Sequence, residues 1–150
     1  MINAESLLAR FVRLAEIPSP SRDEDAVARE AMDMLKALGI ASERDEMGNV
    51  FATVQGVGEP VLLTAHLDTV TPADHVVAIV RDGTVYSDGT SVLGADDKSG
   101  VAIIIEVLDA LQGVQHRPLE ILFTVQEEIG LLGARAFDAS RLASRIGIGL

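Results

Sequence analysis

Apolar residues recur at helical spacing in three segments of the chain, residues 7–15, 24–38 and 101–111. This spacing gathers the apolar side chains on one face, which predicts an amphipathic helix in each segment. The first helix must end before the two prolines of "IPSPS", and the second must end near Gly39. The third segment is apolar around much of its circumference, so we expect it to pack firmly on a sheet.

The second predicted helix is preceded by a capping pattern. Ser21 and Glu24 stand three residues apart just before the apolar run, as in a capping box. In a capping box, each of these two side chains accepts a hydrogen bond from a backbone N–H of the first turn. We therefore expect both side chains to cap the start of this helix.

Runs of β-branched and aromatic residues between the helices predict strands. "NVFATVQG" and "PVLLTAHLD" flank a glycine-containing link and predict a hairpin or meander, in which the second run is the more interior strand. "HVVAIVRDGTVYSDG" predicts two short strands around the Asp82–Gly83 turn. "PLEILFTVQEE" predicts a further strand, followed by short helical turns in "GLLGARAFD" and "ASRLASR" and a last strand in "IGIGL".

The alternation of strands and helices predicts the fold class. It favours an α/β sandwich in which a mixed, mostly parallel sheet has helices on both faces. With 150 residues and no repeat or low-complexity linker, the chain has material for one hydrophobic core. A strand that starts at the last residues, without a cap or polar tail, suggests that the natural chain continues past Leu150 and that the sheet is incomplete.

Composition and charge exclude several classes of partner and ligand. The 12 basic and 23 acidic residues give a formal net charge of -11, which opposes nucleic-acid phosphates and anionic membranes. The chain has no cysteine, so any metal must be held by His, Asp or Glu, which suits zinc, manganese or cobalt. Charged residues interrupt the apolar segments well short of the ~20 residues that span a bilayer, so we expect a cytoplasmic protein without a membrane partner.

Three short segments carry imidazole or carboxylate groups at the ends of predicted strands or in the loops after them. They are "AHLDTV", "GADDKSG" and "VQEEIG". Each has an ordinary explanation, as a surface pair, as helix-capping carboxylates and as a solvated turn respectively. However, open α/β sheets place their sites at the carboxyl ends of strands, so the three segments are expected to meet.

The first two segments offer groups that suit a metal site. His66 and Asp68 are two residues apart on a strand and point to the same side, so the imidazole can bind a metal while the carboxylate fixes its tautomer. Asp96 and Asp97 lie at a helix start, where capping explains one carboxylate more easily than two. One carboxylate has two oxygens and can bridge two cations.

The third segment places two like charges side by side, at Glu127 and Glu128. Neighbouring residues in extended structure face opposite ways, so the two carboxylates need not compete for one position. One can coordinate a metal while the other acts as a general base toward a water beside that metal. This division of roles requires that the three segments converge.

In this order, and about thirty residues apart, "AHLDTV", "LGADDKSGVA" and "EEIGLLGA" resemble the peptidase T branch of the di-zinc exopeptidases, a group that also includes aminoacylases and carboxypeptidases. The resemblance covers nearly the whole chain. It implies a hydrolase that cleaves small peptides, as a tripeptide aminopeptidase does. It also implies two zinc ions in the complete enzyme, with cobalt or manganese as alternatives.

The resemblance implies a role for each candidate site residue. Asp96 would bridge the two zinc ions, and a cis peptide bond would follow it. Glu127 would be the catalytic base and Asp68 would orient the imidazole. The implied metal ligands are His66, Asp96 and Glu128.

The resemblance further implies that residues 1–150 are the N-terminal portion of a single catalytic domain. A lid domain and the later part of the catalytic domain, with two further metal ligands, would be absent. The chain alone is then expected to be inactive or impaired, and exposed sheet edges would favour a homo-oligomer. His75 and His116, in a polar loop and a polar link, are not expected to be ligands.

Three alternatives fit the sequence to different degrees. A related clan of aminopeptidases carries similar motifs, but it has a small domain inserted between the first ligand and the bridging aspartate, which does not fit between His66 and Asp96. The same scaffold with an incomplete metal site would be a non-catalytic peptide- or metal-binding module, which zinc stoichiometry would distinguish. A nucleotide-binding domain is disfavoured, because "GVGE" does not match GxGxxG and no GxxxxGK[ST] occurs.

Overall fold

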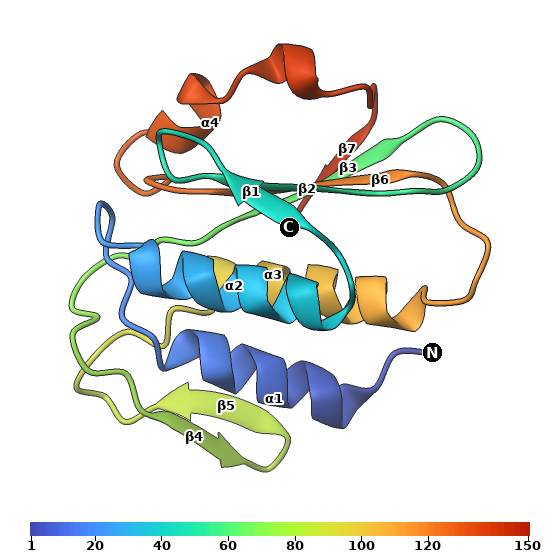
Figure 1. Cartoon of the computed structure of the whole chain (residues 1–150). Helices are drawn as coiled ribbons and strands as arrows, with labels where there is room; N and C mark the ends of the chain where they lie inside the picture. The colour runs from blue at the N-terminus through green and yellow to red at the C-terminus, as the bar shows by residue number, and fades with distance from the viewer.

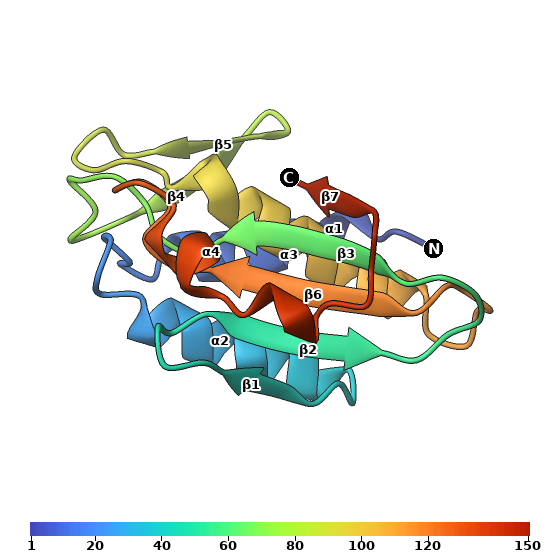
Figure 2. The ribbon, with the colours of Figure 1, turned by 90° about the horizontal axis from the view of Figure 1, so that it is seen from above.

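The computed structural model describes residues 1–150 and has a five-stranded sheet at its centre (Figure 1). The strands run in the order β1-β2-β6-β3-β7, as the view from above shows (Figure 2). β1, β2 and β6 pair antiparallel, whereas β6, β3 and β7 pair parallel, so the sheet is mixed as predicted. The strands are β1 (Ser42–Arg44), β2 (Val50–Val54), β3 (Val61–His66), β6 (Leu119–Thr124) and β7 (Gly147–Gly149).

Helices cover both faces of the sheet, which confirms the predicted α/β sandwich (Figure 1). α2 and α3 lie along one face, and α1 packs on α3 as an outer layer. The opposite face carries only α4 and the 3-10 turn η1. None of these helices has both the length and the apolar character needed to cross a lipid bilayer. Their bounds are α1 (Ala4–Ala15), α2 (Asp25–Ala37), α3 (Ala95–Ala110), α4 (Leu132–Ala136) and η1 (Ala139–Arg141).

The main hydrophobic core lies between the sheet and the face formed by α2 and α3. Leu35 of α2, Ile105 of α3 and Phe123 of β6 are almost completely excluded from solvent there, at the helical and strand positions that the apolar pattern predicts. Each such side chain contributes about 1.5–3 kcal/mol through burial. A smaller cluster on the other face contains Phe51 and Phe137, whose rings lie 5.5 Å apart between centroids.

The predicted pairing of "NVFATVQG" with "PVLLTAHLD", the segments that contain β2 and β3, is wrong. β6, which follows them by more than fifty residues, lies between β2 and β3, and all six of its residues are buried. The chain leaves β3, returns through α3 and adds β6 parallel to β3, so the helical crossover brings a later strand into the middle of the sheet. β4 (Ala78–Arg81) and β5 (Thr84–Ser87) form the predicted hairpin around Asp82–Gly83, beside α1 and apart from the main sheet (Figure 1).

The predicted capping box at the start of α2 is also wrong. Glu24 is the N-cap residue, but its side chain makes no capping hydrogen bond. The hydroxyl of Ser21 donates to Asp68, and the carboxylate of Glu24 accepts from the backbone N–H groups of Arg22 and Gln126. Ser21 therefore bonds to the loop after β3 and Glu24 to the loop after β6, and neither side chain caps α2.

The parallel pairing of β3 and β6 sets the position of the candidate site. His66, the last residue of β3, is opposite Thr124, the last residue of β6, so both strands end at the same edge of the sheet. The first turn of α3 begins at this edge too (Figure 2). The three segments that carry imidazole and carboxylate groups therefore meet at this edge of the sheet.

Candidate metal centre

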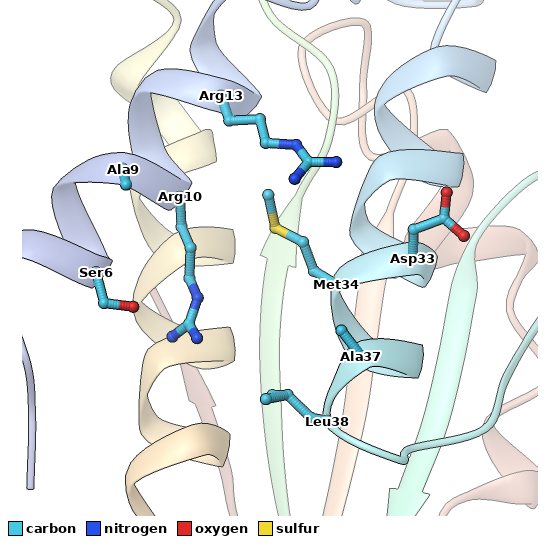
Figure 3. A pocket seen from close by; sticks show the side chains of 8 residues that line it. All are labelled: Ser6, Ala9, Arg10, Arg13, Asp33, Met34, Ala37 and Leu38. Carbon is cyan, nitrogen blue, oxygen red and sulfur yellow. The ribbon is translucent and has the colours of Figure 1, made fainter.

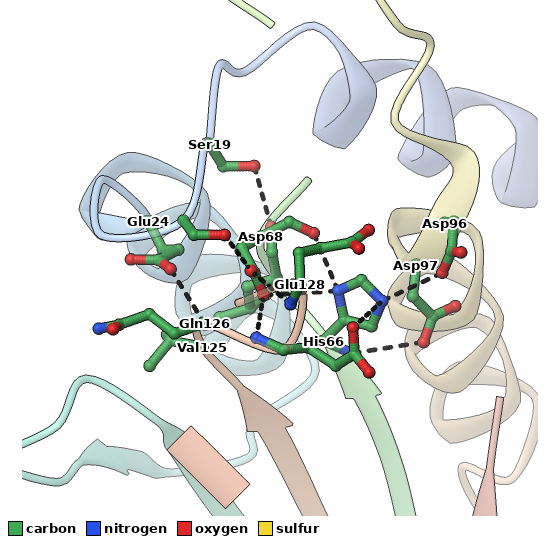
Figure 4. Close-up of polar contacts among 12 residues, drawn as sticks. Ser19, Glu24, His66, Asp68, Asp96, Asp97, Val125, Gln126 and Glu128 are labelled. Atoms are coloured by element: carbon green, nitrogen blue, oxygen red, sulfur yellow. Dashed lines mark hydrogen bonds and ion pairs between the residues drawn. The ribbon is translucent and has the colours of Figure 1, made fainter. Parts of the chain in front are cut away.

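The three candidate ligands converge at the carboxyl ends of β3 and β6 (Figure 4). His66 ends β3, Asp96 lies in the first turn of α3, and Glu128 lies in the turn after β6. One potential ligand atom from each of these side chains lies within 4.8 Å of the others. The structure thus brings together the imidazole and the two carboxylates that the three segments supply.

The imidazole of His66 is held by the backbone on one side and faces carboxylates on the other. Nδ1 donates to the main-chain oxygen of Asp68 at 2.9 Å, whereas the nearer carboxylate oxygen of Asp68 is 3.5 Å away. Nε2 lies 3.0 Å from Oδ1 of Asp96 and 3.9 Å from Oε2 of Glu127. Asp68 thus orients the ring chiefly through its carbonyl, and Nε2 is the nitrogen directed into the cluster.

The carboxylate of Asp68 is fully buried and binds the backbone of the turn after β6. Oδ1 accepts from the backbone N–H of Glu127 at 2.9 Å, and Oδ2 accepts from the N–H of Glu128 at 3.2 Å and from the hydroxyl of Ser21 at 2.7 Å. Burial alone would raise the pKa of Asp68, but these hydrogen bonds and the His66 imidazole outweigh it and lower the pKa to about 2. An ionised Asp68 therefore links the first and third segments.

Negative charge predominates in the cluster. Burial disfavours a protonated His66, but the hydrogen bonds and charges of Asp68 and Asp96 outweigh burial and raise its pKa to about 9. The pKa of Glu128 is raised above its ordinary value by burial, and the charges of Asp96 and Glu127 act in the same direction. A cation would relieve this repulsion, and the donor set of one imidazole nitrogen and several carboxylate oxygens fits zinc.

Asp96 and Asp97 take different roles. The peptide bond between them is cis, as the resemblance implies. The side chain of Asp96 is 87% exposed and turns toward the cluster. The buried carboxylate of Asp97 accepts from the backbone N–H groups of His66 and Gly100, so it ties the end of β3 to the start of α3. Only Asp96 is thus directed to the other candidate ligands.

The two adjacent glutamates do not lie in extended structure, which corrects the expectation from the sequence. β6 ends at Thr124, and Gln126 has a φ of 55°, in the left-handed region. The turn that follows directs the N–H groups of Glu127 and Glu128 to Asp68, while both side chains adjoin the cluster. A turn, and not strand alternation, therefore sets the directions of the two carboxylates.

Two buried polar residues near the site went unrecognised in the sequence. Glu24 matches the capping-box pattern, which offers a local explanation for it. Asn49, fully buried before β2, has no pattern around it that would reveal its role. Its side chain accepts from the N–H of Val125 and donates to the carbonyl of Gly133, so it links the end of β6 to α4.

The other histidines and the cavity between α1 and α2 do not offer a comparable site. His75 and His116 are not part of the cluster. A cavity of about 370 Å³ lies between α1 and α2 (Figure 3). Its two arginines, Arg10 and Arg13, are paired with acidic side chains of α3 and α2, so their charges are already neutralised.

The fold and the cluster together define the class of protein, an α/β domain with a candidate metal centre at the carboxyl ends of its strands. The chain belongs to peptidase family M28, whose model matches residues 49–149. The matched segment contains all three ligand-bearing turns.

Relatives among curated proteins extend over more of the chain. Uncharacterized protein YqjE of Bacillus subtilis (strain 168) is 33% identical over 100% of this chain and 44% of its own length. The cytosol non-specific dipeptidase of Escherichia coli (strain K12) is 35% identical over 91% of this chain and 31% of its own length. The chain therefore spans less than half the length of these relatives.

Solved structures show the same overlap. A tripeptidase from Staphylococcus aureus superposes with a TM-score of 0.93 at 36% identity, over 99% of this chain and 43% of that one. Aminopeptidase PepT from Bacillus cereus superposes with a TM-score of 0.95 at 31% identity, over 99% of this chain and 43% of that one. These similarities include α1 and α2, and they confirm the resemblance to peptidase T.

Proposed function

We propose that this chain carries part of the active site of a zinc-dependent exopeptidase that hydrolyses small peptides in the manner of a tripeptide aminopeptidase. The observation that carries the proposal is the convergence of His66, Asp96 and Glu128 within 4.8 Å, with Glu127 beside them. The names of the similar tripeptidase, PepT and dipeptidase support a small peptide as the substrate.

The proposed ligand set divides between two cation positions. His66 would hold one zinc ion, Glu128 would hold the other, and Asp96 would be shared by both. Cobalt or manganese would suit the same nitrogen and oxygen donors. Zinc in such a site supplies a Lewis acid that polarises a carbonyl group and lowers the pKa of a nearby water toward ~7.

Glu127 is the proposed proton carrier. Its Oε2 lies 3.9 Å from Nε2 of His66 and its side chain is 35% exposed, so it borders the cluster and remains open to water and substrate. Its carboxylate takes a proton from the attacking water and delivers it to the nitrogen of the leaving amine. Asp68 holds the backbone N–H of Glu127 and so fixes the base of this side chain.

The complete protein would supply the parts of the active site that this chain lacks. Residues 1–150 form the N-terminal portion of a single catalytic domain, and a lid and two further ligands come from elsewhere in the protein. On this view the chain alone is inactive or impaired, and it acts in the cytoplasm with a small peptide as its partner. The exposed strand β7 at the edge of the sheet favours association into a homo-oligomer.

The test combines tripeptide hydrolysis with zinc stoichiometry in the complete protein. Glu127→Ala should lower turnover at least about 100-fold, because a general base is removed, while the zinc content stays near that of the wild type. Glu128→Ala is the matched control and should lose zinc together with activity. Hydrolysis that survives Glu127→Ala would contradict the role of Glu127. A folded wild type without zinc would favour the non-catalytic binding module.

A further inference from the structure

Four consecutive backbone N–H groups just after β6 are held by three buried side chains from earlier parts of the chain, of which Figure 4 labels Glu24 and Asp68. None of these bonds belongs to a helix or to a strand ladder, so the path of the turn depends on the side chains that accept them. The pairs are Val125 with Asn49 at 3.1 Å, Gln126 with Glu24 at 3.1 Å, Glu127 with Asp68 at 2.9 Å and Glu128 with Asp68 at 3.2 Å.

The second N–H of this run belongs to the residue at which the chain changes direction. Gln126 has a φ of 55°, a left-handed conformation that costs a residue with a side chain about 1–2 kcal/mol. Such a conformation persists where surrounding contacts over-determine it. The carboxylate of Glu24 supplies the contact to the Gln126 peptide, from the start of α2.

The burial of a carboxyl group at position 24 is unfavourable for the free energy of folding. It is only 6% exposed, and burial raises the pKa of its carboxyl above the ordinary value. No arginine, lysine or histidine forms an ion pair with it, and it makes no capping bond to α2. A buried carboxyl without a basic partner is destabilising unless hydrogen bonds satisfy it. The bonds present are the two to the N–H groups of Arg22 and Gln126, both on Oε1.

We propose that Glu24 is a positioning residue for the turn after β6, because its carboxylate fixes the Gln126 peptide and thereby directs Glu127 and Glu128 toward the cluster. Glu24 acts through that peptide and touches neither metal nor substrate. The inference rests on the proposed function, in which Glu127 is the base and Glu128 a ligand.

The first experiment measures the zinc affinity of the complete protein by competition with a chromophoric chelator. Glu24→Ala should weaken zinc binding about 10- to 100-fold, the usual effect of losing a partner that orients a ligand. Glu24→Gln should recover most of the affinity, because its amide oxygen can accept from the Gln126 N–H. Glu24→Asp keeps the charge but is too short, so it should resemble Glu24→Ala, and it serves if Glu24→Ala does not fold.

Glu120 supplies a matched control for burial and stability. It is 5% exposed and also accepts from two backbone N–H groups, those of Ala143 and Ser144, at the opposite end of β6. Glu120→Ala should lower the unfolding midpoint as Glu24→Ala does but leave zinc affinity unchanged. Equal losses of affinity in the two variants, or unchanged affinity in Glu24→Ala, would overturn the proposal.

A measurement without metal separates this inference from the proposed function. In the metal-free protein, Glu24→Ala should speed hydrogen exchange of the Gln126 amide and shift the amide resonances of Glu127 and Glu128, whereas Glu120→Ala should do neither. If the complete wild-type protein takes up no zinc, the proposed function fails and these amide signals decide the positioning role alone. Unchanged exchange at Gln126 would then overturn it.

Discussion

Nδ1 of His66 lies 2.9 Å from the main-chain oxygen of Asp68, but 3.5 Å from its carboxylate. The main-chain oxygen is present whatever side chain stands at position 68, so it can orient the imidazole without the carboxylate. The carboxylate instead accepts from the N–H groups of Glu127 and Glu128. A substitution at Asp68 should therefore act first on the turn after β6 and only second on the imidazole.

Asp68→Asn tests this order of effects. The amide has one oxygen and one NH₂ group, so one of the two N–H groups of the turn must face a donor. We expect zinc affinity to fall about 10- to 100-fold and the amide resonances of Glu127 and Glu128 to shift. The Nδ1–H resonance of His66 should stay unchanged, because its hydrogen bond to the main-chain oxygen at position 68 remains. Two-dimensional NMR of the metal-free protein measures both signals. A change confined to His66 would contradict the expectation.

Asn49→Ala should be among the more destabilising changes near the site. It leaves the N–H of Val125 and one bond of the Gly133 carbonyl unsatisfied in a buried place, which costs about 2–4 kcal/mol. Asn3 is the matched control, because it caps α1 at an exposed position and its replacement by Ala costs about 1 kcal/mol. Urea denaturation measures both changes, and equal losses would show that the buried contacts of Asn49 add nothing.

Gly133→Ala should lower the stability of the contact between the end of β6 and α4 by overpacking. A Cβ at this position would lie 2.3 Å from the backbone oxygen of Val125 and 2.4 Å from Oδ1 of Asn49, so the turn or the asparagine must move, at about 1–3 kcal/mol. Gly147→Ala is the control, since its Cβ would meet only Leu62 at 3.6 Å and should change stability by less than about 0.5 kcal/mol. Thermal unfolding of the two variants gives the comparison.

The elements that the sequence predicts well are those that local patterns determine. The helical spacing of apolar residues marks α1, α2 and α3, and the Asp82–Gly83 turn marks the hairpin of β4 and β5, because each pattern involves residues close together in the chain. The order β2-β6-β3 could not be predicted in this way. It depends on how α3 returns the chain across the sheet, which strand propensity does not record.

In the candidate site, too, local motifs can be recognised in the sequence, whereas contacts between distant residues cannot. The motifs that hold His66, Asp96 and Glu128 are visible because each combines unusual residue types within a few positions. The residues that support them are not. Ser21 and Glu24 fit a local capping box, yet their partners Asp68 and Gln126 lie 47 and 102 positions away, and only the folded chain shows that these contacts replace the local ones.

Glu120 should give the protein a pH-dependent stability in the acid range. Burial alone would raise the pKa of Glu120, but hydrogen bonds from Ser144 and Ala143 outweigh it and hold the pKa below the model value of 4.5. A carboxyl whose folded-state pKa is lowered stabilises the fold above its unfolded pKa, and this contribution disappears as the pH falls through the folded pKa. Compared with Glu120→Gln, the wild type should therefore keep a constant advantage in unfolding free energy above about pH 5 and lose it progressively below pH 4.5. Urea denaturation at a series of pH values measures the difference, and a constant difference down to pH 2 would contradict the prediction.

Zinc should stabilise the folded chain through the cluster and through no other histidine. A ligand that binds only the folded state, at about 100 times its dissociation constant, adds about 2.7 kcal/mol, which for a chain of this size raises the unfolding midpoint by about 5–10 °C. His66→Ala and Glu128→Gln should abolish this shift, because each removes one of the converging ligand atoms. His75→Ala and His116→Ala are matched controls and should keep the full shift, and a chelator should reverse it in every protein that shows it. Differential scanning calorimetry with and without zinc measures all five proteins, and a shift that survives His66→Ala but is lost in His75→Ala would move the metal site away from the carboxyl ends of β3 and β6.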